Sequence, residues 1–272
     1  IQHFKALETL LVGRHGSTFA TNSNLLGNAN LDTSGLTELK KLHINYNDDM
    51  TSLDVTNNLK LESLAINVTS LSFIDLTNNV ELLEFAMSSC PNFTTAPDLS
   101  NNIKLTHLEI SANNLPSIDI SNNTELVKLY AHNMTGLNII DTSTNTKLKE
   151  FICFNTGFIS FDFSTNTKLE ILQTDGGTAS SLDVSVNTLI HRLHVQWYSN
   201  LTTLDLSNNV NITHLWLGQN NLSLVDLGSS MSLSAIAASA GGAYFLGNDP
   251  NLVIKVGTAA RVTQAQALAA SG

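Results

Sequence analysis

A motif of 21 to 23 residues recurs along most of this 272-residue chain and constrains its fold more than any other feature. Its most regular part is an aspartate that follows an apolar residue or, once, a proline. These aspartates are Asp32, Asp54, Asp75, Asp98, Asp119, Asp141, Asp162, Asp183, Asp205 and Asp226. Self-similarity at such a period is typical of a solenoid, in which each repeat buries its apolar side only by stacking on its neighbours. We therefore expect a stack of about ten repeats.

Each repeat carries two apolar segments. Its clearest example runs Leu105-x-x-Leu108-x-Ile110-x-x-Asn113-x-Leu115-x-x-Ile118-Asp119-Ile120-Ser121-x-Asn123. Alternating apolar residues, as in Leu108-x-Ile110, are typical of a strand with one buried face. The first segment thus predicts strands of a main parallel sheet, and the segment around each aspartate predicts a second set of short extended segments on the other side.

This pattern resembles the leucine-rich-repeat signature LxxLxLxxNxL. With its second half, LxxLDLSxN, it is similar to the short repeats of 21–22 residues in bacterial surface proteins, especially those of Bacteroidetes. The ending NDPNLVIKV, residues 248–256, resembles the closing strand of those proteins, and the resemblance covers roughly residues 31–256. It implies a leucine-rich-repeat solenoid and an extracellular or cell-surface location, with the signal peptide not in this chain.

The expected organisation has three parts. Residues 1–31 form an N-terminal cap with an irregular insertion, and residues 32–240 form about ten leucine-rich repeats. Residues 241–272 form a C-terminal cap, with a strand at 252–256 and a small helix at about 259–271. Few or no convex helices are expected between the strands, because a repeat of about 21 residues leaves only short connections.

Composition and motifs exclude several functions. The formal net charge of −10 argues against a nucleic-acid partner, which needs a basic face. No run of 18 apolar residues occurs, so no membrane insertion is expected. Neither a nucleophile elbow, a zinc-protease motif nor a P-loop is present, so we predict no enzyme, cofactor or metal. His194 and His214 could meet across adjacent repeats, but two ligands alone make a weak metal site.

The repeated polar residues have mainly structural interpretations. An asparagine four residues after most aspartates is expected to bond backbone groups of the next repeat. The aspartates are expected to cap turns through the Ser or Thr two residues on, although a cation-binding or acidic adhesive surface stays open as an alternative. Cys153 occupies an inward position and Cys90 the position that Asn113 fills elsewhere, so both are predicted to be free, buried thiols.

The solvent-facing positions of the main sheet do not repeat, whereas the buried ones do. That face is therefore free to recognise a protein or glycan ligand. Aromatic residues gather there, with Trp197 and Tyr198 just past a strand, and such residues are common interface and sugar-stacking anchors. The candidate ligand-binding residues are His107, Glu109, Tyr130, His132, Phe154, Arg192, His194, His214 and Trp216. The alternative is a structural repeat subunit or spacer of a larger extracellular or phage assembly; the oligomeric state stays open.

Overall fold

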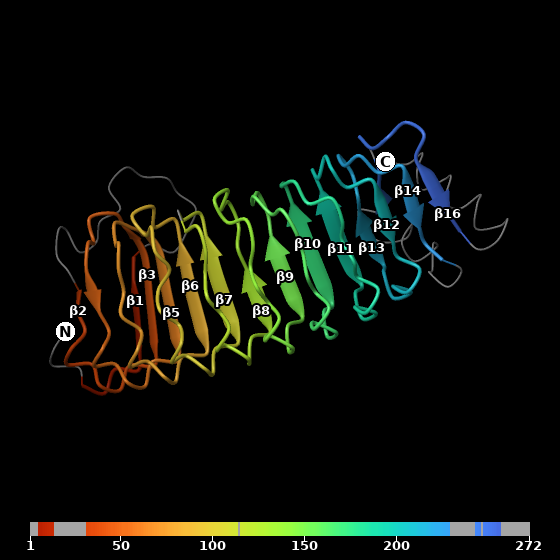
Figure 1. Ribbon diagram of the computed structural model, residues 1–272. Helices are drawn as coiled ribbons and strands as arrows, with labels where there is room; N and C mark the ends of the chain where they lie inside the picture. The colour runs from red at the N-terminus through yellow and green to blue at the C-terminus, as the bar shows by residue number, and fades with distance from the viewer. Residues whose placement is uncertain (1–4, 14–30, 114, 229–242, 246, 257–272) are drawn as a thin grey trace. The chain divides into compact units, whose positions relative to one another are not determined.

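A computed structural model describes residues 5–13, 31–113, 115–228, 243–245 and 247–256 (Figure 1). The chain consists of two compact units, residues 1–136 and 137–272. Within the described ranges every regular element is a β-strand, and no helix there could cross a membrane. The expectation of few or no convex helices is confirmed for these ranges, whereas the expected helix at about 259–271 lies outside them.

The first unit is built on one parallel sheet, whose strands lie side by side in Figure 1. In order across the sheet they are β1 (Thr9–Val12), β3 (Lys41–Asn47), β5 (Ser63–Thr69), β6 (Glu84–Ser88), β7 (His107–Ser111) and β8 (Lys128–Tyr130). The repeat period sets the register: Leu64 lies opposite Phe85, and Phe85 opposite Leu108. On the other side, the short strands β2 (Leu31–Asp32) and β4 (Leu53–Asp54) pair in parallel, as the second apolar segment predicted.

The second unit repeats this plan. Its main-sheet strands are β9 (Glu150–Cys153), β10 (Ile171–Asp175), β11 (Arg192–Gln196), β13 (His214–Trp216) and β15 (Ala243–Tyr244). Its second sheet has the order β12 (Thr203–Asp205), β14 (Leu224–Asp226) and β16 (Val253–Lys255). Strand β16 lies within residues 252–256, where the sequence predicted a closing strand.

The core of each unit consists of the repeating apolar positions. In one repeat, Leu105, Leu108 and Ile110 expose at most 1% of their surface, and Leu115 and Ile120 are equally buried. A fully buried side chain of this kind contributes about 1.5–3 kcal/mol relative to an exposed one. Because each repeat supplies several such residues, stacking on neighbouring repeats dominates the stability of the fold.

A column of buried asparagines, here called the Asn ladder, joins successive repeats. The Nδ2 group of Asn79 donates to the backbone oxygens of Val55 and Asn58, both at 3.0 Å. The Nδ2 group of Asn102 donates in turn to Leu76, at 3.1 Å, and to Asn79, at 2.9 Å. The structural role is therefore confirmed, but the predicted direction is wrong, since Asn79 and Asn102 both bond the preceding repeat. The turn carbonyls of one repeat point along the stack toward the following asparagine, which donates back to them.

The members of the Asn ladder in the two units are Asn58, Asn79, Asn102, Asn123, Asn145, Asn166, Asn187 and Asn209. Two of them also use their side-chain oxygen: Thr33 donates its hydroxyl to Asn58 Oδ1 at 2.8 Å, and Thr142 donates to Asn166 Oδ1 at 2.9 Å. Where an aliphatic residue replaces this threonine, as Val55 does before Asn79, the amide oxygen is buried without a hydrogen-bond partner in the described structure.

Candidate functional site

The repeated aspartates cap turns. The Oδ1 atom of Asp54 accepts the backbone N–H of Thr56 at 2.9 Å and its hydroxyl at 2.6 Å. These two bonds hold the pKa of the Asp54 carboxyl below its usual value. The same turn forms between Asp32 and Ser34, Asp75 and Thr77, Asp98 and Ser100, Asp119 and Ser121, Asp141 and Ser143, Asp162 and Ser164, Asp183 and Ser185, and Asp205 and Ser207. This geometry confirms the turn-capping interpretation, and the described residues contain no group of three or more His, Cys, Asp or Glu arranged to hold a metal.

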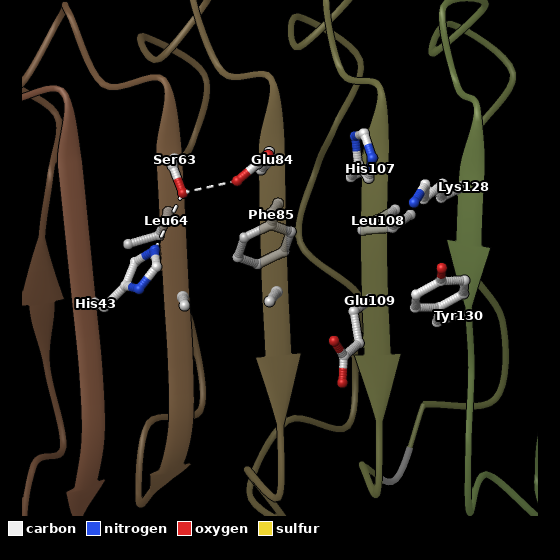
Figure 2. A pocket seen from close by; sticks show the side chains of 12 residues that line it. His43, Ser63, Leu64, Glu84, Phe85, His107, Leu108, Glu109, Lys128 and Tyr130 are labelled. Atoms are coloured by element: carbon white, nitrogen blue, oxygen red, sulfur yellow. Dashed lines mark hydrogen bonds between the residues drawn. The ribbon is translucent and has the colours of Figure 1, made fainter. Parts of the chain in front are cut away.

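The solvent face of the first unit's main sheet carries a hollow of about 230 Å³ (Figure 2). Small side chains create it, because Ala65 and Ala86 lie opposite each other on β5 and β6, between His43 and Glu109 in the same row. Tyr130 lies beside Glu109 on β8 and completes that row. Of the predicted ligand-binding residues, His107, Glu109 and Tyr130 line this hollow.

Polar groups surround the hollow. His43 Nε2 lies 3.1 Å from the Ser63 hydroxyl, which donates to Glu84 Oε2 at 3.2 Å (Figure 2). Because that hydroxyl has one hydrogen, Nε2 of His43 is the donor in this pair. The Nδ1 atom of His107 bonds the Thr106 hydroxyl at 2.9 Å.

The neighbouring side chain His132 stacks on Tyr130, with 6.3 Å between ring centroids and 25° between ring planes. Its backbone N–H donates to the Ser111 hydroxyl at 3.2 Å. The two predicted residues therefore form one aromatic pair at the end of β8, where Tyr130 is the last residue of the strand.

In the second unit, the predicted residues Phe154, His194, His214 and Trp216 gather in one half-buried group, here called the aromatic cluster. Ring centroids are 5.3 Å apart for Phe154 and His194 and 5.8 Å apart for His194 and Trp216. His214 stacks on Trp216 at 5.8 Å with 29° between the ring planes. Register explains the grouping, since His194 on β11 lies opposite Trp216 on β13.

The aromatic cluster favours neutral histidine rings. Burial lowers the pKa of His194, whose Nε2 atom lies 2.6 Å from Gln196 Oε1. Burial and the positive charge of Arg192 lower the pKa of His214, which lies opposite Arg192 across the strand pair. The Nε atom of Arg192 is buried and has no hydrogen-bond partner within the described residues. The cluster therefore offers flat, weakly charged rings beside one guanidinium.

Two predictions next to the face have clear outcomes. Tyr198 is not on the face: it is completely buried, and its hydroxyl bonds the Thr174 hydroxyl at 2.5 Å. It takes the repeat position of Asn113, whose side chain points into the core. Trp197, one residue earlier, is 58% exposed on the turn. Cys90 and Cys153 form no disulfide and are fully buried, as predicted, and burial raises the pKa of Cys90.

Comparisons with known proteins bear on the fold. No protein-family model and no curated protein sequence matches the chain. The functional domain of InlJ from Listeria monocytogenes, whose structure includes a cysteine ladder, matches 71% of this chain with a TM-score of 0.56 and 25% identity. The chain spans about half of that structure, 47% of its length. An internalin, InlF, from the same species matches 85% of this chain and 73% of its own length, with a TM-score of 0.64 and 17% identity. The chain thus has the leucine-rich-repeat fold of bacterial structural neighbours.

Proposed function

We propose that this chain is a non-catalytic recognition or adhesion module that binds a protein or glycan on the exposed face of its main sheet. The observation that carries the proposal is the aromatic cluster of Phe154, His194, His214 and Trp216. The fold does not need these rings, because the inward positions of the same strands already fill the core with residues such as Leu193 and Leu215.

The chemistry of the aromatic cluster suits a macromolecular ligand. Tryptophan, tyrosine and arginine dominate the binding energy of many interfaces, and aromatic faces also stack on apolar ligand surfaces. Trp216 is held between His194 and His214, so its ring loses little conformational freedom on binding. Arg192, half-buried opposite His214, adds a positive charge beside the rings.

We further propose that the module belongs to an exported protein and acts outside the cell or at its surface. The support is the likeness of the repeats to those of bacterial surface proteins and of the fold to an internalin. Secretion can be tested directly by expressing the full-length gene product in its host and locating it by surface proteolysis of intact cells. Protection from protease on intact cells would contradict the proposal.

The test of recognition is a glycan array together with a pull-down from surface-protein extracts. Three proteins are compared: the parent chain, Trp216→Ala, and Trp197→Ala as a matched control that removes an exposed tryptophan outside the aromatic cluster. Loss of at least about tenfold in affinity is expected for Trp216→Ala alone, the size typical of an aromatic anchor. Equal binding by all three proteins, or no ligand in either screen, would contradict recognition through the aromatic cluster. Repeating the screen with calcium and with EDTA tests the aspartates as a cation-dependent adhesive surface.

A second candidate function is a structural subunit or spacer of a larger assembly. The observation that favours it is a row of exposed apolar residues at one position of consecutive repeats in the first unit. Leu59, Val80 and Ile103 are exposed by 56%, 44% and 56%. Self-association that Val80→Asp abolishes, measured by analytical ultracentrifugation, would favour this function, whereas a monomer at all concentrations would exclude it.

A further inference from the structure

We propose that the hollow on the first unit's sheet face binds a single neutral monosaccharide unit of a glycan. This inference rests on the proposed function and specifies its ligand class at a second place on the face. Three properties of the hollow carry it: its size, the balance of its polar groups, and an aromatic wall beside an apolar floor.

Size limits the occupant. The hollow has a volume of about 230 Å³, which is below the roughly 300–1,000 Å³ of sites that enclose drug-sized ligands. It therefore accommodates one ring or one side chain rather than a whole cofactor. Its floor is apolar, because Ala65 and Ala86 lie side by side where longer side chains would fill the space.

The charged groups around the hollow disfavour an anionic occupant and can bond a polyhydroxylated one. Two carboxylates, Glu84 and Glu109, and one ammonium group, Lys128, line the hollow together with two histidines. An anionic ligand would face both carboxylates, which outnumber the one ammonium group. Sugar hydroxyl groups donate and accept hydrogen bonds, so a neutral sugar can donate to the carboxylates and brings no charge of its own.

Specific groups are available for those bonds. The carboxylate of Glu109 makes no hydrogen bond or ion pair within the described residues, although it lies half-buried at the wall of the hollow. Glu84 uses Oε2 to accept from Ser63, while Oε1 has no bond in the described structure. Hydrogen bonds to charged groups are among the stronger polar contacts, so both acceptors favour a hydroxyl-bearing ligand.

The wall formed by Tyr130 supplies the remaining element of sugar recognition. Tyr130 lies beside Glu109 in register and lines the hollow on the side of β8, one strand beyond the carboxylate (Figure 2). Aromatic rings contact the C–H face of a sugar through burial of apolar surface, while the edge hydroxyls stay available to polar neighbours.

The experiment is a nuclear magnetic resonance titration of chain labelled at its alanine methyl groups, with methyl glucoside, methyl galactoside and methyl mannoside as probes. Glucuronic acid and N-acetyl-lysine methylamide test the anionic and cationic alternatives. We expect at least one neutral hexoside to shift the Ala65 and Ala86 methyl signals, with Kd on the order of 1 mM for a ligand of about a dozen non-hydrogen atoms. No shift up to about 50 mM, or shifts caused only by a charged probe, would overturn the inference.

Variants locate the binding. Ala86→Leu fills the hollow and should abolish the Ala65 shift, whereas Ser88→Leu, on the same strand and face but outside the hollow, should leave it unchanged. Glu109→Gln should weaken binding about tenfold, and Glu62→Gln, an exposed carboxylate elsewhere, should not. Tyr130→Phe should keep binding that Tyr130→Ala loses. If the hexosides fail here while Trp216-dependent binding persists, the hollow alone is refuted and the proposed function stands.

Discussion

Replacing Asn102 by aspartate is the sharpest test of how the Asn ladder holds repeats together. Asn102 is completely buried, and its Nδ2 group donates to the backbone oxygens of Leu76 and Asn79 at 3.1 and 2.9 Å. Aspartate has the same shape but no N–H group, so an ionised carboxylate would face two carbonyl oxygens. The new carboxyl group should therefore remain protonated in the folded chain, with its pKa raised.

The expected cost follows from these contacts. A protonated carboxyl group keeps one donor of the two, so about 1 kcal/mol is lost with the other bond. Keeping it protonated at pH 7, against an unfolded pKa of about 3.9, costs up to about 4 kcal/mol. Because the folded pKa is raised, the second cost grows as pH rises above about 4 and vanishes below it. We expect Asn102→Asp to lose about 3–5 kcal/mol of unfolding free energy at pH 7 and about 1–2 kcal/mol at pH 4.

Urea denaturation followed by circular dichroism measures both values. Asn101→Asp is the matched control, because the neighbouring Asn101 also donates to the preceding repeat, at 3.0 Å from Thr77 O, but is exposed. Its new charge remains in solvent, so its cost should stay below about 1 kcal/mol at either pH. Equal costs for the two variants at pH 7, or a cost for Asn102→Asp that does not change with pH, would refute the reasoning.

Three further predictions concern stability. Val68 has a left-handed backbone with φ of 55°, at the repeat position where Asn133 and Asn155 have φ of 53° and 51°. Because asparagine tolerates this conformation better than valine, Val68→Asn should raise the unfolding free energy by about 1 kcal/mol. A lower melting temperature in thermal denaturation would contradict this prediction. Val55→Thr places a hydroxyl near the unpartnered Asn79 Oδ1, as Thr33 does for Asn58. The control is Val225→Thr, whose new hydroxyl has the apolar neighbours of that strand around it. In urea denaturation, Val55→Thr should lose about 1 kcal/mol less unfolding free energy than Val225→Thr, and equal losses would contradict the prediction. Hydrogen bonds lower the pKa values of Asp54, Asp75 and Asp183, so these carboxylates stabilise the fold above the unfolded pKa of about 3.9, and this stabilisation is lost as pH falls. Thr77→Ala removes one of the bonds to Asp75, so the urea midpoint of this variant should fall less steeply between pH 5 and about pH 3. An unchanged slope would exclude the Asp75 turn as a source of the pH dependence of stability.

The repeat period made the strands and their register predictable from sequence. Alternation places Leu108 and Ile110 inward and His107 and Glu109 outward, and a period of about 21 residues aligns His107 with Lys128 and Glu109 with Tyr130. The aspartate turns were predictable for the same reason, since the Ser or Thr two residues on supplies both donors. Local chemistry and periodicity agree in these parts, so the sequence specifies them strongly.

Features that depend on the orientation or size of one side chain at a repeat position were harder to predict. Tyr198 carries no obvious core signal, and only its alignment with Cys90 and Asn113 could have revealed that it points inward. The left-handed position after each strand holds Gly176 and Gly247 but also residues as different as Val68 and Trp197, so composition gave no sign of it. The hollow required knowing that Ala65 and Ala86 are neighbours between longer side chains; two alanines in one column were the available signal.

The aromatic cluster could be predicted as a gathering of residues but not as a set of contacts. Register alone places His194 beside Trp216, whereas the approach of Phe154 to His194 crosses β10 and depends on the ring orientations. Burial of His194, which lowers its pKa, follows from that packing and has no sequence signal of its own.

Recognition through the sheet face is tested most directly by the fluorescence of one tryptophan at a time. The chain has two, so Trp197→Phe leaves Trp216 in the aromatic cluster as the sole reporter, and Trp216→Phe leaves Trp197 on the turn. Each variant is titrated with the ligand that the array or the pull-down identifies. A saturable change in Trp216 emission, with none for Trp197, is the predicted result. A change confined to Trp197, or saturable binding that leaves Trp216 emission unaltered, would contradict the account.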